Sequence, residues 1–147
     1  MSVDLERAKE ILRSADYTCV LCREDMVLTT QERGVLPLLR WLGTGADTSG
    51  CCAADKVVGK AAALLYCLLG VRSVHGNVMS SAAVKVLRRH GIEAHWDILT
   101  EFIRNRAGTA PCPMEAATAQ IDDPEAALPV ILDTLQSQNP RLSRGLD

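Results

Sequence analysis

Two predicted helix starts carry the side chains best suited to chemistry in this sequence. The first is the segment Gly50–Lys60, which contains Asp55, Lys56 and Lys60. If a helix begins here, its dipole stabilises the carboxylate in the first turn, and Lys56 and Lys60 share one face four residues apart. The two lysines could then hold an anionic ligand. The alternative is that Asp55 only caps the helix, the lysines are solvated, and Gly59 lets a neighbouring backbone come close.

The second predicted helix start is at Cys112, because Pro113 suits the first position of a helix. Glu115 lies three residues after Cys112, where it can bond back to the helix start as in a capping box. A thiol in this position has a lowered pKa and is more nucleophilic if solvent reaches it, so Cys112 is the candidate nucleophile. The alternative is a buried, inert thiol that acts as a small apolar cap.

The other cysteines and histidines form no comparable pattern. Cys19 and Cys22 fall on a predicted strand, where residues three apart point to opposite faces and do not easily hold one metal ion. His75, His90 and His95 are too scattered to make a metal triad by their spacing. The sequence has no phosphate-binding loop, dinucleotide fingerprint or serine elbow. We therefore expect no metal and no cofactor.

Length and composition predict one globular domain. The chain has 147 residues, of which 48% are hydrophobic and 23% charged. A formal net charge of -2 offers no basic field for nucleic acid, and an aromatic content of 3% offers few stacking platforms. We expect the domain to span residues 1–138 and residues 139–147 to form a flexible tail.

The hydrophobic segments predict a cytoplasmic protein that does not contact a membrane. Met1–Glu10 is rich in charge and lacks the apolar core of a secretory signal. The longest uncharged apolar run, Ala61–Val71, is about half the length of a membrane span. In a reducing compartment, the six cysteines are expected to be free thiols.

Periodicity predicts the elements that must position the candidate residues. In the first half we expect a helix, two strands of a hairpin, a short helix and a long apolar helix, at Ser2–Ala15, Tyr17–Arg23, Met26–Thr30, Val35–Leu42 and Ala53–Leu69. We then expect a strand, a helix and a strand at Arg72–Val78, Ser80–His90 and Ile92–Trp96, and short helices at Ile98–Arg104, Pro113–Gln120 and Pro124–Leu135. The strand, helix, strand order predicts a parallel pair, so the sheet is mixed.

Three segments in this order resemble a small prokaryotic family of uncharacterised function, namely Glu32–Leu39, Ala54–Ala63, and Asn105–Thr109 with Cys112–Glu115. That family is similar to divergent members of the cytidine-deaminase-like fold, and the resemblance covers most of the chain. It implies an α/β protein with a three-layer α/β/α sandwich and a mixed sheet. This agrees with the element order predicted from periodicity.

The resemblance does not extend to the zinc motifs of the deaminases. Those enzymes use His or Cys, Ala and Glu at the start of one helix, and Pro-Cys-x-x-Cys at the start of the next. Here Ala54–Lys56 takes the first place, and Pro111–Glu115 keeps only the first cysteine of the second motif. Two carboxylates beside one thiolate suit zinc poorly, so we expect no zinc-dependent deamination.

The resemblance places the two helix starts at one cleft. The cleft would be lined by Asp55, Lys56, Lys60, Cys112 and Glu115, with Asn105, Arg106 and Thr109 on a loop above it. Arg106 and a lysine could clamp a phosphate or carboxylate. We therefore expect metal-independent binding of a nucleotide-like or other anionic small molecule, with Cys112 as nucleophile or Lys56 and Asp55 as acid–base pair if it is an enzyme. The alternative is a non-catalytic regulatory or structural module.

Overall fold

The computed structural model describes residues 2–104, 108, 110 and 112–138. Its elements in chain order are α1 (Val3–Ser14), β1 (Cys19–Arg23), β2 (Met26–Thr30), α2 (Leu36–Thr44), β3 (Cys52–Val58), α3 (Lys60–Leu69), β4 (Ser73–Ser80), α4 (Ser81–Arg89), β5 (Glu93–Thr100), α5 (Pro113–Thr118) and α6 (Pro124–Gln138). The expected tail, residues 139–147, lies outside the described residues.

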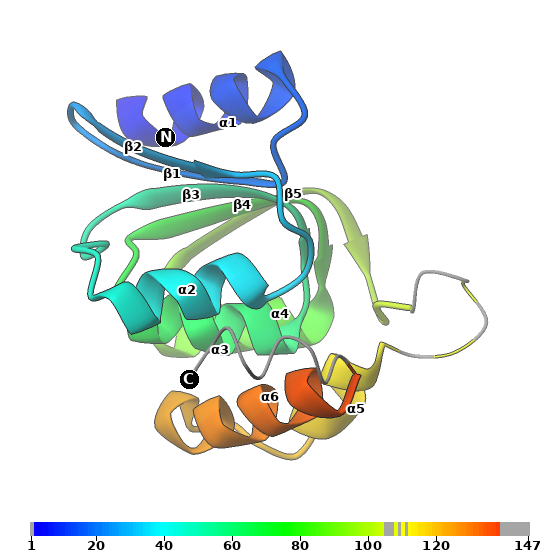
Figure 1. Cartoon of the computed structure of the whole chain (residues 1–147). Coiled ribbons are helices and arrows are strands. Elements are labelled where there is room, and N and C mark those ends of the chain that lie inside the picture. Colours follow the sequence, from blue (N-terminus) through cyan, green and yellow to red (C-terminus); the bar gives the residue numbers. More distant parts are fainter. Residues whose placement is uncertain (1, 105–107, 109, 111, 139–147) are drawn as a thin grey trace.

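One mixed sheet in the order β2-β1-β3-β4-β5 organises the fold. The predicted hairpin of β1 and β2 is confirmed, and β1 also pairs antiparallel with β3. The strands β3, β4 and β5 are parallel, connected by α3 and α4. Helix α1 covers one face, while α2, α3 and α4 cover the other and α6 packs outside α3 (Figure 1). The expected α/β class with a mixed sheet between helices is confirmed.

The predicted helix over Ala53–Leu69 is wrong in its first half. Residues Cys52–Val58 form β3, and α3 begins only at Lys60, after Gly59. A central strand is buried on both faces, so it has a continuous apolar run that periodicity alone does not distinguish from a buried helix. The β-branched pair Val57 and Val58 and the following glycine are the local signals for a strand that ends here.

The predicted short helix over Ile98–Arg104 is also wrong, because β5 continues to Thr100. Ile98 lies beside Val78 in the register of β4 and β5, so the strand is held by its neighbour and not by local preference. The remaining predicted elements are present and differ from the structure only at their ends.

The core has two parts, on the two faces of the sheet. The larger part fills the space between the sheet and α2, α3, α4 and α6, with Leu64, Leu65 and Tyr66 of α3 fully buried. The smaller part joins α1 to β1 and β3. All six cysteines are free thiols. Among the described helices, none has the length and apolar character needed to span a membrane.

Candidate functional site

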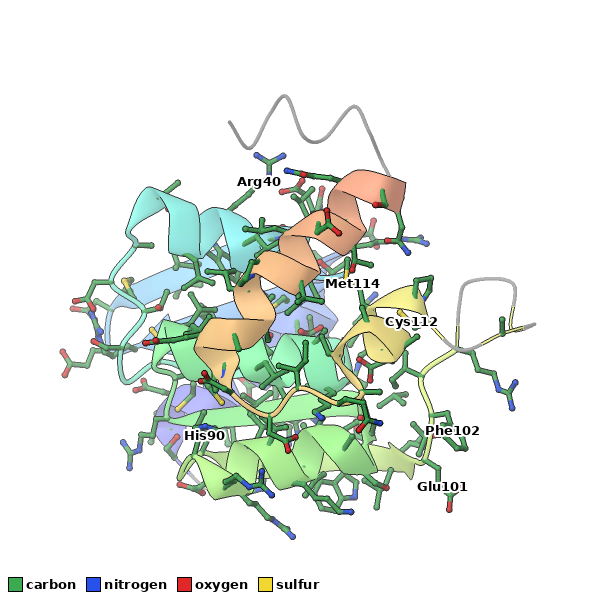
Figure 2. All side chains as sticks on the ribbon, turned by 90° about the horizontal axis from the view of Figure 1, so that it is seen from below. Arg40, His90, Glu101, Phe102, Cys112 and Met114 are labelled. Atoms are coloured by element: carbon green, nitrogen blue, oxygen red, sulfur yellow. The ribbon has the colours of Figure 1, made fainter. Side chains whose placement is uncertain are left out.

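A cavity of about 700 Å³ lies where the carboxyl end of β3 meets the starts of α2 and α3. It is lined by Asp16, Thr18, Cys19, Gln31, Arg33, Gly34, Val35, Asp55, Lys56, Val57, Gly59, Ala61, Ala62, Ile103, Cys112, Met114 and Glu115. Cys112 and Met114 come from α5 (Figure 2). In sheets with parallel strands, ligands typically bind at the carboxyl ends of the strands, and this cavity has that location.

Four of the predicted site residues line this one cavity: Asp55, Lys56, Cys112 and Glu115. Lys60 does not. Its side chain is 9% exposed, and its Nζ donates to the carbonyl oxygen of Ala119 at 3.0 Å and pairs with Asp122 at 2.9 Å. Lys60 therefore ties α3 to the loop after α5. The other predicted residues, Asn105, Arg106 and Thr109, lie outside the described residues.

The predicted helical setting of Asp55 and Lys56 is wrong, because both lie on β3. They are not in the first turn of a helix, and Lys56 and Lys60 do not share a helix face, since Gly59 separates strand from helix. The helix starts that border the cavity are those of α2, α3 and α5, so the predicted helix start at Cys112 does lie there. The sequence therefore predicts that Asp55 and Lys56 meet Cys112 and Glu115 at one cavity, but not that Asp55 and Lys56 come from a strand.

Glu115 caps α3 and not its own helix. Its Oε1 accepts a hydrogen bond from the backbone N–H of Lys60 at 2.7 Å, and its Oε2 accepts one from Ala61 at 3.1 Å. The positive end of the α3 dipole stabilises this carboxylate. A Cβ atom on Gly59 would overlap the carboxylate, so the contact requires glycine at that position. The predicted capping box within α5 is wrong.

Asp55 belongs to a hydrogen-bonded chain that reaches into the core. The buried hydroxyl of Tyr66 donates to Asp55 Oδ2 at 2.6 Å, and Cys19 Sγ lies 3.0 Å from the same hydroxyl. Burial raises the pKa of Asp55 from its usual 3.8 to about 6, although the bond from Tyr66 acts in the opposite direction. Burial also raises the pKa values of Tyr66 and Cys19 well above their usual values. Near neutral pH, the proton that can move in this chain is therefore that of Asp55.

The cavity holds charges of both signs. Asp16, Asp55 and Glu115 are acidic, and Arg33 and Lys56 are basic. Arg33 and Lys56 are both exposed, and neither pairs with an acidic side chain among the residues that the structure describes. Glu115 is bound by the start of α3 and does not pair with either cation. Among the described residues that line the cavity, Arg33 and Lys56 are therefore the cationic side chains that a ligand could contact.

Cys112 lies at the N-terminal end of α5 and is half-buried. Its backbone N–H donates to the carbonyl oxygen of Ile103 at 2.9 Å, which joins the segment after β5 to α5. Within the described part of the chain, no group of three or more His, Cys, Asp or Glu side chains is arranged to hold a metal ion.

Among the residues of this site that sequence reasoning missed, Cys19, Arg33 and Tyr66 carry the chemistry described above. Tyr66 had a detectable signal, because it is the one aromatic residue in the apolar run Ala61–Leu69 and a buried hydroxyl needs a partner. Nothing local indicated that the partner is Asp55 or that Cys19 lies beside it. That arrangement follows from the antiparallel pairing of β1 and β3, which sets Cys19 opposite Asp55.

Comparison with known proteins decides the family. Residues 7–135 match the TM1506 family, described as a domain of unknown function (DUF1893). The chain belongs to this family. A crystal structure of a DUF1893 family protein (TM1506) from Thermotoga maritima superposes with a TM-score of 0.81 at 26% identity, covering 90% of this chain and 91% of that chain. No curated protein is detectably similar. The DUF1893 match confirms the expected family of uncharacterised function.

The contact between Glu115 and α3 predicts coupled effects on stability. We expect Glu115→Ala to lower the free energy of unfolding by about 0.5–2 kcal/mol, as for the loss of a helix cap. Gly59→Ala should also destabilise, because its methyl group displaces the carboxylate. In the double variant the two losses should not add, since the methyl group no longer meets a carboxylate. Urea denaturation measures all three, and strictly additive losses would contradict the contact.

The raised pKa of Asp55 predicts a pH-dependent stability. Between the unfolded pKa near 3.8 and the folded pKa of about 6, only the folded state holds the proton, so this group's stabilising contribution is present below pH 4 and is lost as the pH rises through 6. The loss is on the order of 3 kcal/mol. Asp55→Asn, which does not titrate, should lack this fall. Unfolding free energies of both proteins from pH 4 to 7 test it, and parallel curves would disprove it.

Proposed function

We propose that the cavity binds a small molecule of nucleotide-like size with an anionic group, without a metal ion. The observation that supports this most directly is the presence of two cations without acidic partners, Arg33 and Lys56, beside Asp55 in one cavity. Its volume of about 700 Å³ falls within the range common for small-molecule sites.

The lining favours a ligand with two chemically different parts. Val35, Val57, Ala61, Ala62 and Met114 offer an apolar surface against which a flat or apolar body can pack. Arg33 and Lys56 suit a phosphate or carboxylate. The Asp55 carboxyl can exchange a hydrogen bond with an N–H or O–H group of the body. A nucleotide has both parts, which is why this class of ligand is proposed.

Catalysis would use Asp55 and Cys112. A carboxyl group with a pKa of about 6 is suited to transferring protons near neutral pH, and Tyr66 holds it in one orientation. Cys112 lies at the same cavity and would be the nucleophile, with Lys56 balancing charge near Asp55. Ligand binding without turnover would instead favour a non-catalytic regulatory module.

We extend the proposal to the fold type and the compartment. A cytidine-deaminase-like fold is supported by the mixed sheet and by a cavity at two helix starts, the feature on which zinc deaminases build their site. Here those two starts are Gly59–Ala61 of α3, which carries no cysteine or histidine, and Cys112–Glu115 of α5, which keeps one cysteine. The carboxylate of Glu115 binds the start of α3. Six free thiols support a reducing, cytoplasmic location.

Ligand binding is tested by thermal shift and calorimetry with nucleoside monophosphates and other phosphorylated metabolites. A binder should raise the unfolding temperature of the wild-type protein. Removing one charge-assisted hydrogen bond with Lys56→Ala or Arg33→Ala should weaken the affinity about tenfold or more. Lys85→Ala, on the exposed side of α4, is the matched control and should have no effect. A library without binders, or binders insensitive to both cavity variants, would refute the proposal.

The nucleophile role of Cys112 is tested by alkylation with iodoacetamide at neutral pH. Cys67 is also half-buried, and burial raises its pKa to about 11, so it serves as an internal control. We expect Cys112 to react faster than Cys67, and a bound ligand to protect it. Mass spectrometry of tryptic peptides gives both rates. Equal or slower labelling of Cys112 would remove it from the proposed chemistry.

A further inference from the structure

The outer edge of β5 is open in the part of the chain that the structure describes. β5 ends the sheet on the side opposite β2 and pairs only with β4 (Figure 1). The C-terminal end of β5 carries exposed apolar side chains: Ile98 is 60% and Leu99 48% exposed, and Phe102, just beyond the strand, is 66% exposed. An open strand edge carries backbone groups that can pair with another strand.

The backbone of β5 limits how such a partner can pair. The N–H of Glu93 donates to the carbonyl oxygen of Arg72, so the backbone groups of Glu93, and of every second residue after it, face β4. Those of Ala94, Trp96 and Ile98 face outward. In an antiparallel ladder, two residues directly opposite each other either both make the hydrogen bonds or neither does. A second β5 can therefore pair only in a register whose two-fold axis passes through one residue, so that this residue lies opposite its own copy.

The register centred on Trp96 is complementary on both faces. It places Ala94 opposite Ile98 of the second copy, and Trp96 opposite Trp96; Ala94 and Trp96 lie on the face toward the helices, where Arg88 of α4 stacks over Trp96. On the other face, it places His95 opposite Asp97 of the second copy, twice by symmetry. The two His95–Asp97 pairs are positions without backbone hydrogen bonds between them, and at such positions opposite side chains come closest. Cross-strand pairs of these kinds stabilise a sheet.

The neighbouring registers bring like charges together. Centred on Asp97, the pairing would place Asp97 opposite its own copy and Glu93 opposite Glu101. Centred on His95, it would place Glu93 opposite Asp97. Like charges directly opposite each other destabilise a strand pair. Charge complementarity therefore favours the register centred on Trp96 over these two neighbours.

We propose that the protein forms a two-fold symmetric dimer through antiparallel pairing of β5 with β5 of a second copy, centred on Trp96. The two sheets then become one continuous sheet, and the open edge disappears. Helix α1 packs mainly on β1 and β3, and its Lys9 borders the hollow that His95 and Asp97 line on β5. Within one chain, Asp97 Oδ1 lies 3.4 Å from His75 Nε2, and His95 Nε2 lies 3.4 Å from Glu93 Oε1. The dimer would give Asp97 and His95 each a second partner.

A charge swap tests this register. Light scattering coupled to gel filtration, run from low micromolar to near-millimolar protein, should show the wild-type mass rising toward about 32 kDa, twice the 15.9 kDa of one chain. His95→Asp should give a monomer, because it places aspartate opposite Asp97. The double variant H95D/D97H should restore the dimer. Ser137→Asp, on α6, changes the net charge equally and should leave the dimer intact.

Hydrogen exchange adds a readout that is independent of these variants. The amide hydrogens of Ala94, Trp96 and Ile98 should exchange more slowly as the wild-type concentration rises, whereas that of Glu93 is already bonded within one chain. Circular dichroism spectra that match the wild-type spectrum would show that the variants are folded. A wild-type protein that stays monomeric, a dimer that survives H95D, or a swap that fails to restore it would each overturn the proposal.

Discussion

The carboxylate of Glu115 at the start of α3 is the contact that the rest of the site depends on. It joins α5 to the helix that follows the central strand, across 55 residues of sequence. The contact satisfies two backbone N–H groups that would otherwise be without partners, and it is allowed only because Gly59 has no side chain. One wall of the cavity, formed by Cys112, Met114 and Glu115, is held in place by it.

This contact also determines which groups are available to a ligand. The start of a helix is a good anion site, but here the protein's own carboxylate fills the one at α3. An anionic group entering the cavity would therefore be recognised by side chains, Arg33 and Lys56, and not by the α3 dipole. Asp55 lines the cavity, while its Oδ2 is bound by the core hydroxyl of Tyr66 and its Oδ1 accepts a long hydrogen bond from the backbone N–H of Val57. Under the proposed function, charge recognition and proton transfer would fall to different residues.

The cavity and the outer edge of β5 lie at the two ends of a short connection. β5 ends at Thr100, and Ile103, three residues later, lines the cavity and accepts a hydrogen bond from Cys112. The strand that would pair with a second copy is therefore followed directly by a segment that lines the candidate site. The two proposals remain physically separate, because none of the charged residues used for strand pairing contributes to the cavity lining.

Much of the local structure could be predicted from the sequence. The amphipathic spacing of α1, the hairpin of β1 and β2, and α4 between two parallel strands all follow from periods that a sequence displays directly. The residue types of the candidate site were also identified, since Asp55, Lys56, Cys112 and Glu115 do meet at one cavity. The helices and the hairpin depend on side chains near one another in the chain, whereas the meeting of the four site residues was implied by the family resemblance.

Only the tertiary structure decided how those residues are used. Whether the apolar run from Cys52 is strand or helix depends on the strands at its sides, because both structures bury it equally well. The partners of Glu115, Lys60 and Asp55 come from elements that folding brings together. The role predicted for each residue from its neighbours in the sequence therefore differs from the one it has in the structure. A polar group removed from water takes whichever partner the packing supplies, and spacing along the chain does not specify that partner.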